Sequence, residues 1–159
     1  VAAACAAVYL HGQLGRQRTQ PFIAAAVAHH QRELPLEVTE AQLPAIQTWF
    51  KGKVDFAPTR IPALSNVSLL GARLSNITDR QAAYVAWGAP GGRGRVSLFV
   101  FDAPELEVRS DHRVKDREVL IANQQGYNVA MWKDNEIAYS LVSDLSEEDI
   151  LRLVSASDR

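Results

Sequence analysis

The amino-acid sequence predicts an α+β fold: an antiparallel sheet of about five strands, with N-terminal helices and a short C-terminal helix. Three observations predict it. Apolar residues recur at helical spacing up to about residue 52, and beyond Pro62 they alternate with a period of two. A capping pattern then opens a last helix at Ser146. The chain has 159 residues, 47% hydrophobic and 22% charged, which suffices for one buried core without disulfides or a metal.

Residues 1–10 form an uncharged run of mostly small residues, shorter than the ~20 apolar residues that cross a bilayer. The run fits the remainder of a membrane helix, a buried Ala-rich helix or a cleaved signal peptide. The basic residues Arg16 and Arg18 fit poorly with an outward-facing exit, because positive residues tend to stay in the cytoplasm.

Two helices are expected before the sheet. Ile23 and Val27 lie at helical spacing and predict a helix over residues 21–34, with Pro21 in its first turn. The second helix is expected over residues 39–51. Its start is predicted by a capping box from Thr39 to Gln42, and Gly52 is expected to end it in a left-handed conformation.

The sheet is predicted from short runs rich in aromatic and β-branched residues, each bounded by turn residues. These runs are Val67–Leu74, Ala82–Trp87, Val96–Phe101, Tyr127–Trp132 and Ile137–Val142. A two-residue turn at Asp134-Asn135 would pair Lys133 with Glu136. Residues 102–118 are charge-mixed without periodicity and are expected to form a long loop or an irregular edge.

The last helix is predicted over residues 146–155. Ser146 is expected to cap it, with Asp149 as its capping-box partner, and Leu145 and Ile150 form a hydrophobic staple. We expect the three helices to pack mainly on one face of the sheet.

The hairpin of residues 127–142 is apolar on both faces, so something must cover each. One face is expected to carry Tyr127, Val129, Met131, Ala138 and Val142, and the other Ala130, Trp132, Ile137, Tyr139 and Leu141. Three short helices would hardly cover both. We therefore expect a homodimer whose interface uses the second sheet face or residues 1–14.

Composition and motifs argue against several kinds of site. A net charge of −1 lacks the basic footprint of a nucleic-acid binder. The glycine-rich loop of residues 88–95 precedes a strand and has no Lys-Ser/Thr ending, so it is expected to connect a hairpin and not to bind phosphate. The adjacent His29 and His30 point about 100° apart on a helix. His29 and Glu33 share a face without a third ligand, so we expect no metal site and no cofactor.

Catalysis has little support. The chain contains no Gly-x-Ser-x-Gly elbow, and the lone Cys5 lies in an apolar run without an activating partner. Asp55, Asp111 and Asp144 each lie where a turn or cap favours aspartate. We therefore expect that the chain is not an enzyme.

A succession of motifs resembles the C-terminal, extracytoplasmic part of a bacterial family, the transmembrane transcriptional regulators called anti-sigma factors. The resemblance starts with the run of residues 49–58 and continues through residues 69–74, 82–85, 96–100, 126–132 and 138–145. Its motif residues are Trp49, Phe50, Gly52, Lys53, Asp55, Phe56, Pro58, Gly71, Arg73, Tyr127, Trp132, Tyr139, Ser143 and Asp144. The sequence departs from the family at Ala72, where a second glycine is common, and in the longer loop at 88–95.

The resemblance implies a cytoplasmic sigma-binding segment, often with a His/Cys zinc motif, followed by one membrane helix and this domain. Residues 1–20 would be the remnant of the membrane helix and its juxtamembrane segment, and residues 21–159 a single periplasmic domain. The implied function is non-catalytic: regulating transcription by controlling release of a sigma factor, the partner of a segment absent from this chain. The alternative is an envelope protein-interaction or assembly module.

Elementary chemistry gives the motif residues structural roles. Trp49 and Phe50 are expected to anchor the second helix to the sheet, and Gly52 and Gly71 to adopt backbone conformations that other residues tolerate poorly. The charged motif residues could form ion pairs, with Lys53 or Arg73 paired to Asp55 or Asp144.

Overall fold

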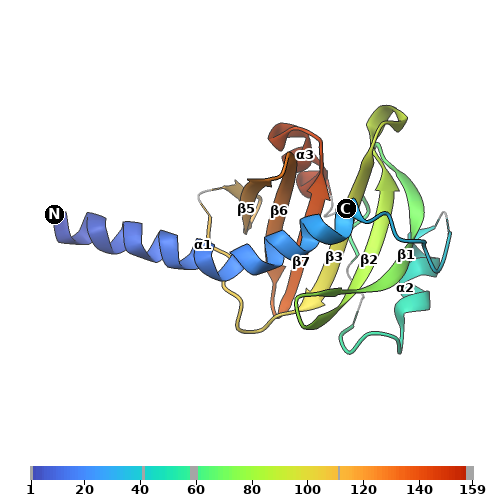
Figure 1. Cartoon of the computed structure of the whole chain (residues 1–159), viewed down its shortest axis with the longest axis horizontal. Coiled ribbons are helices and arrows are strands. Elements are labelled where there is room, and N and C mark those ends of the chain that lie inside the picture. The colour runs from blue at the N-terminus through green and yellow to red at the C-terminus, as the bar shows by residue number, and fades with distance from the viewer. Residues whose placement is uncertain (1, 41, 58–60, 111, 157–159) are drawn as a thin grey trace.

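The computed structural model describes residues 2–40, 42–57, 61–110 and 112–156 and confirms an α+β fold (Figure 1). Within these residues the chain forms three α-helices, one 3-10 turn and a seven-stranded antiparallel sheet. The helices are α1 (Ala2–Gln31), α2 (Leu43–Phe50) and α3 (Glu147–Ala156), and the 3-10 turn is η1 (Pro90–Gly92). The strands are β1 (Ser68–Ile77), β2 (Arg80–Gly88), β3 (Arg95–Asp102), β4 (Arg113–Val114), β5 (Arg117–Gln124), β6 (Tyr127–Asp134) and β7 (Ile137–Ser143).

The sheet follows the spatial order β1-β2-β3-β7-β6-β5-β4. It is wider than the predicted five strands because β4 and β5 were missed. The segment 102–118, expected to be irregular, contains β4 and the first residues of β5. β5 pairs with β6 through a two-residue turn in which Gln125 and Gly126 both have positive φ. The glycine loop of residues 88–95 connects β2 to β3, as predicted.

The β6–β7 hairpin has the predicted faces in a different register. Trp132 pairs with Tyr139 and Asp134 with Ile137, so the turn is Asn135-Glu136 and not Asp134-Asn135. Asn135 takes a φ of 54°, which asparagine tolerates better than most residues. The register shift is two residues, so each side chain keeps its predicted face.

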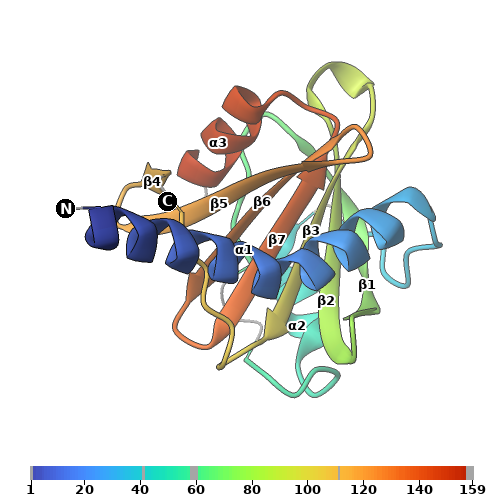
Figure 2. The same ribbon diagram turned by 60° about the vertical axis from the view of Figure 1, so that its left-hand side comes forward.

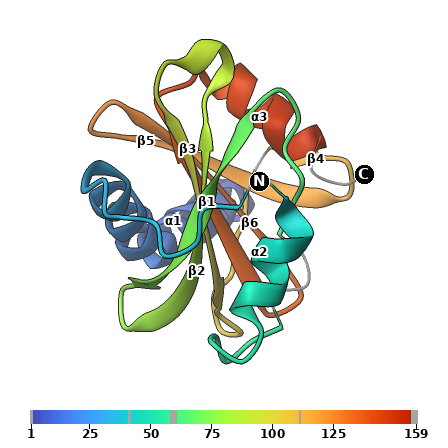
Figure 3. The ribbon, with the colours of Figure 1, turned by 90° about the vertical axis from the view of Figure 1, so that its right-hand side faces the viewer.

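The helices lie on opposite faces of the sheet, and the prediction that they share one face is wrong. Figure 3 shows α1 on one side and α2 with α3 on the other. Phe50 of α2 and Ile150 of α3 belong to one apolar core with Trp132. Ile23 and Val27 of α1 belong to a second core on the other face. Each face of the sheet is therefore covered by the protein's own helices and loops.

α1 is one continuous helix where a break near residue 21 was predicted. At 1.5 Å per residue its 30 residues extend about 45 Å. It runs through Pro21, which has no N–H to donate to the carbonyl four residues earlier, a loss of about 3 kcal/mol in a helix interior. Burial of Ile23, Ala26 and Val27 directly after the proline offsets this cost.

The two halves of α1 have different surroundings. The C-terminal half lies across the sheet, and the N-terminal half extends beyond it (Figures 1 and 2). Phe22 stacks on Phe101 with ring centroids 5.5 Å apart, and Gln20 donates to Gln124 at 2.9 Å. No helix among the described residues is long and apolar enough to cross a membrane.

α2 is shorter than the predicted helix over 39–51. It begins at Leu43, which puts Pro44 in the first turn, where a missing N–H costs nothing. A start at Thr39 would have placed Pro44 in the helix interior, so Thr39 is not the cap. Gly52, at a φ of 73°, follows the end of α2 in the left-handed conformation that was predicted.

α3 begins as predicted, within one residue. The backbone N–H of Asp149 donates to Ser146 Oγ at 3.2 Å, and the Ser146 hydroxyl donates to Asp149 Oδ2 at 2.8 Å. Ile150 is buried against the sheet, next to the half-buried Leu145. This cap sets where the chain turns from β7 into α3.

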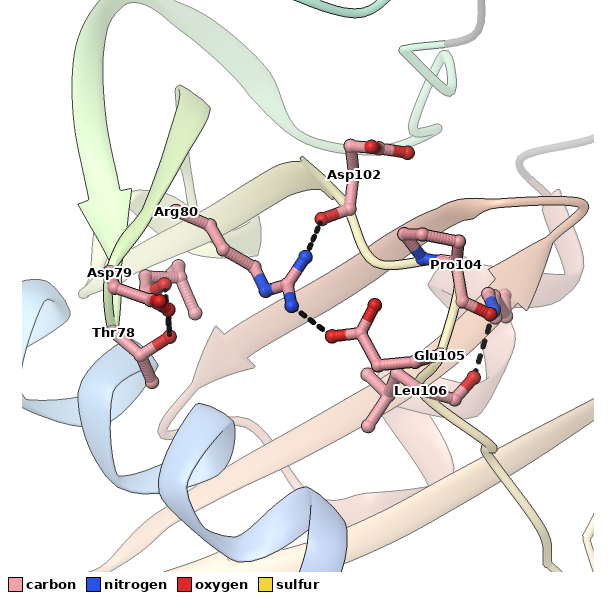
Figure 4. A network of polar contacts seen from close by, with 9 residues as sticks. Thr78, Asp79, Arg80, Asp102, Pro104, Glu105 and Leu106 are labelled. Atoms are coloured by element: carbon pink, nitrogen blue, oxygen red, sulfur yellow. Dashed lines mark hydrogen bonds and ion pairs between the residues drawn. The ribbon is translucent and has the colours of Figure 1, made fainter.

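Residues 103–108 cover the part of the α1 face that α1 leaves open, with Ala103 and Leu106 buried. Figure 4 shows Arg80 holding this segment: its Nη1 donates to the carbonyl of Asp102 at 2.8 Å, and its Nη2 forms an ion pair with Glu105. Lys133 donates to the carbonyls of Pro104 and Leu106, at 2.8 and 2.9 Å. In the observed register Lys133 lies opposite Ala138, so Glu136 is not its cross-strand partner as predicted.

The outer edge of β1 is partly closed by the segment after α1. Val38 and Ala72 exchange backbone hydrogen bonds of 2.8 and 3.1 Å, and Glu37 Oε2 accepts the N–H of Leu74 at 2.6 Å. Gly71 permits this approach, since a Cβ there would lie 2.1 Å from the carbonyl oxygen of Val38. Its φ of 149° confirms the predicted need for glycine.

Candidate functional site

Most of the family-motif residues have structural roles and do not meet at one site. Phe50 is fully buried under α2, and Trp49 packs edge-on against it at 5.0 Å. Both therefore anchor α2, as predicted. Lys53 Nζ lies 5.0 Å from the ring centroid of Trp49, a cation–π contact and not an ion pair with an aspartate.

Two motif residues that follow α2, Asp55 and Phe56, are at least partly exposed to solvent. Asp55 is exposed and Phe56 is half-buried against the core. Pro58, and Asp111 of the predicted turn aspartates, lie outside the described residues.

The motif residues of the last hairpin also support the core. Trp132 and Tyr139 stack in parallel, with ring centroids 5.2 Å apart, on the face covered by α2 and α3. Ser143 is buried, and its Oγ accepts the N–H of Leu145 at 3.3 Å, where β7 turns toward α3. The exposed Asp144 lies against Gly94, where a Cβ would come within 2.9 Å of its Oδ1.

A chain of polar side chains lies buried where α1 crosses the sheet. His30 Nδ1 lies 2.7 Å from Ser97 Oγ of β3, and that oxygen lies 3.0 Å from the hydroxyl of Tyr84 on β2. The exposed fractions of His30, Ser97 and Tyr84 are 6%, 0% and 5%. Tyr127, a motif residue, packs against the ring of His30 with centroids 4.9 Å apart. These contacts fix the angle at which the end of α1 meets the sheet.

The surroundings of His30 keep its imidazole neutral. Burial is the main cause that lowers its pKa, and the guanidinium of Arg95 adds to it; Asp144 and Glu33 oppose the shift. The result is a pKa of about 4, against 6.5 in the unfolded chain. Arg95 also donates to the carbonyl of His30 at 2.6 Å, which satisfies a backbone acceptor at the end of α1.

A shallow recess open to solvent lies beside these polar side chains. Side chains from α1, β1, β2 and β3 surround it together with the segment after α1: His29, Leu34, Arg73, Ser75, Tyr84 and Phe99. Tyr84 belongs to both the recess and the buried chain. The structure thus brings one predicted motif residue, Arg73, to a concave surface with several polar groups.

Two guanidinium groups act on the imidazole of His29 at this recess. The pKa of His29 is lowered first by burial and then by the guanidinium groups of Arg32 and Arg73. Arg73 does not pair with Asp55 or Asp144; its Nε donates to the carbonyl of Leu74 at 3.0 Å. That bond uses one of the five donors of the guanidinium.

Sequence reasoning missed the buried chain, although two signals pointed to it. His30 continues the spacing of Ile23 and Val27, which places it on the packed face of α1. Ser97 is a polar residue inside a run of apolar strand residues. What the sequence lacks is any sign that these two residues, 67 positions apart, meet.

The buried polar side chains and the recess differ in their access to solvent. The imidazole and the two hydroxyls of the buried chain have almost no access to solvent. Within the part of the chain that the structure describes, no three His, Cys, Asp or Glu side chains gather closely enough to hold a metal ion. The recess, by contrast, is open to solvent, and its lining includes the guanidinium of Arg73, the imidazole of His29 and the hydroxyl of Ser75.

Comparison with family models, with curated proteins and with solved structures found no match for this chain.

Proposed function

We propose that this chain is the non-catalytic extracytoplasmic domain of a membrane-anchored anti-sigma factor, which crosses the cell membrane once. It would regulate transcription by controlling the release of a sigma factor from a cytoplasmic segment outside this sequence. The succession of motifs between Trp49 and Leu145 suggests the family. The structural observation that supports this proposal is the form of α1.

α1 is suited to carry a change of packing out of the domain. Its C-terminal half is held on the sheet by the stacked rings of Phe22 and Phe101 and by the bond between His30 and Ser97. Its N-terminal half continues from there beyond the sheet without a break (Figure 1). A continuous helix transmits a rotation or a shift at one end to the other, which a flexible linker does not.

Helix phase provides the test. In the full-length protein, in its own bacterium, two alanines inserted between Arg18 and Thr19 would rotate the outer half of α1 by about 200° relative to the sheet. Seven alanines would rotate it by about 700°, within about 20° of two full turns, and serve as the matched control. We expect the two-residue insertion to change transcription from sigma-dependent promoters and the seven-residue insertion to leave it near wild type.

Deletion of residues 19–159 is the second arm of this experiment. We expect it to change sigma-dependent transcription at least as strongly as the two-residue insertion. If neither change alters transcription, the proposal is wrong, and an envelope interaction or assembly module becomes the better assignment.

The proposed homodimer cannot use a face of the sheet as its interface. Both faces are covered within one chain, so the argument from an uncovered face no longer supports it. The remaining candidate is the projecting half of α1, within residues 1–14. Light scattering on the whole chain and on a version without residues 1–14 tests this, since only the whole chain is expected to report twice the monomer mass.

A further inference from the structure

We propose that the outer edge of β5, from Leu120 to Gln124, binds a short extended segment of another protein, which pairs with β5 as an added strand. The side chains of that segment are uncharged and rich in β-branched residues. This inference does not depend on the anti-sigma assignment, because it concerns only β5 and its surroundings and can be tested on this chain alone.

The direction of the backbone groups of β5 follows from a bond at the start of the strand. The N–H of Val119 donates to the carbonyl of His112 at 2.9 Å, on the side away from β6. Successive residues of a strand direct their N–H and C=O groups to alternate sides, so those of Ile121 and Asn123 also point away from β6. Among the described residues, neither has a backbone partner on that side. These outward groups are therefore available to a further strand.

The two edges of the sheet differ in how they are protected. At the β1 edge, Val38 exchanges backbone bonds with Ala72, and the carboxylate of Glu37 accepts the N–H of Leu74. At the other edge, β4 has two residues and pairs only with the first two residues of β5. An unpaired strand edge is a template for pairing with another chain, and proteins usually block it with charged side chains or a bulge. Residues 119–124 contain no charged side chain.

The free part of β5 lies between two helices. Figure 2 shows β5 at the near edge of the sheet, with α1 on one side of it and α3 on the other. Its apolar side chains here are only partly buried: Ile121 packs against the core under α2 and α3, and Ala122 against the core under α1. An added strand covers both, since its own side chains alternate between the same two faces. Uncharged side chains fit this place, because a charge beside Ile121 would lose water without gaining a partner.

The position of α1 favours a single strand over a second copy of this chain. Its N-terminal half projects past β5 (Figure 1), and the bond from Gln20 to Gln124 holds the helix beside the end of this strand. Neighbouring strands lie about 4.8 Å apart, so one added strand needs little room beside β5. In a second copy both faces of the sheet are covered, so one of these layers would meet the projecting helix.

The probe is a capped pentapeptide, Thr-Val-Thr-Val-Thr. The control peptide has prolines at its third and fourth positions, so that both sides of its backbone lose a donor. Amide hydrogen exchange, followed by NMR, is the direct measurement. We expect the probe to slow exchange at Ile121 and Asn123 and to leave the amide of Asn76, on the β1 edge, unchanged. The proline peptide is expected to slow none of the three.

Two proline substitutions locate the site. Asn123→Pro removes an outward donor at an exposed position without removing a bond to β6, and is expected to weaken binding of the probe at least about tenfold. Asn76→Pro is the matched control. Asn76 is also exposed, and its N–H points outward from β1, two residues after that of Leu74, which Glu37 accepts. This variant is expected to bind the probe like the wild type, and equal binding by the two proline variants would overturn the proposal.

The exchange measurement on the unmodified chain decides the matter even if a proline variant does not fold. If the probe at millimolar concentration leaves exchange at Ile121 and Asn123 unchanged, this edge does not accept a strand. If both amides exchange slowly without the probe, and Asn123→Pro converts a dimer to a monomer in light scattering, a second copy occupies the edge and the proposal is wrong.

Discussion

Replacing His30 with asparagine is expected to remove a large part of the acid sensitivity of this fold. The side-chain amide of asparagine can place a polar atom near the position of the imidazole Nδ1, so the hydrogen bond with Ser97 can be kept. The amide does not titrate. Loss of the ring contact with Tyr127 is expected to cost about 1 kcal/mol of stability at every pH.

The magnitude follows from the two pKa values of His30. The pKa is 6.5 in the unfolded chain and about 4 in the folded protein. Between these values the unfolded chain binds a proton that the folded protein does not, so stability falls as the pH drops from about 6.5 toward 4. A full shift of this size lowers the free energy of unfolding by about 2 kcal/mol between pH 7 and pH 5. Because Arg95 and Asp144 are partly exposed to solvent, we expect about 1–2 kcal/mol.

The assay is urea denaturation at pH 7 and pH 5, on the wild type and on His30→Asn. The difference in the free energy of unfolding between pH 7 and pH 5 should be smaller in the variant than in the wild type by about 1–2 kcal/mol. Carboxylates that titrate near pH 4 act equally in both proteins and cancel in this comparison. An equal pH dependence in the two proteins would show that His30 is not the neutral, buried group described above.

Three further predictions concern single positions and are checked by the same denaturation assay. Gly71→Ala is expected to lower the free energy of unfolding by more than about 2 kcal/mol, because the added Cβ would collide with the carbonyl of Val38. Gly52→Ala should cost only about 1 kcal/mol for its positive φ, since an added Cβ there meets no described neighbour within 4 Å. Similar losses of stability in the two variants would contradict this reasoning. Ser146→Ala should cost about 1 kcal/mol through the lost cap of α3, and no loss would mean that the cap is not formed in solution. Ser140→Ala should be neutral or stabilising by up to about 1 kcal/mol, since its buried Oγ has no hydrogen-bond partner among the described residues, while Ser97→Ala should destabilise. The reverse order would refute the assignment of these two hydroxyls.

The sequence predicts local features well, because these depend on neighbours along the chain. Ser146 caps α3 within a single turn, and Gly52 ends α2 through its own backbone conformation. The faces of the last hairpin were also predicted correctly, although the register was not. Alternation with a period of two survives a slip of two residues, so Trp132 points to the same face whether it pairs with Ile137 or with Tyr139.

Features that depend on tertiary contacts were not predicted. A break at Pro21 is the ordinary expectation, and only the burial of Ile23 and Val27 on the sheet explains why the helix continues through it. The contact between His30 and Ser97 joins residues 67 positions apart, and nothing in either local sequence indicates the other. Arg73 was singled out by resemblance, but its place in a recess with His29 depends on how α1 crosses the sheet.

The strand order also has a consequence for the folding kinetics of this protein. β1-β2-β3 and β5-β6-β7 are each built from hairpins, so their contacts form between residues close in sequence. The two units meet where β3 pairs with β7, and there Ser97 lies opposite Val142. Pairing β3 with β7 requires the long segment between them to be ordered, and such long-range pairing is a slow step in folding. Substitutions where β3 pairs with β7 are therefore expected to change the folding rate more than substitutions within either hairpin unit that cause the same loss of stability.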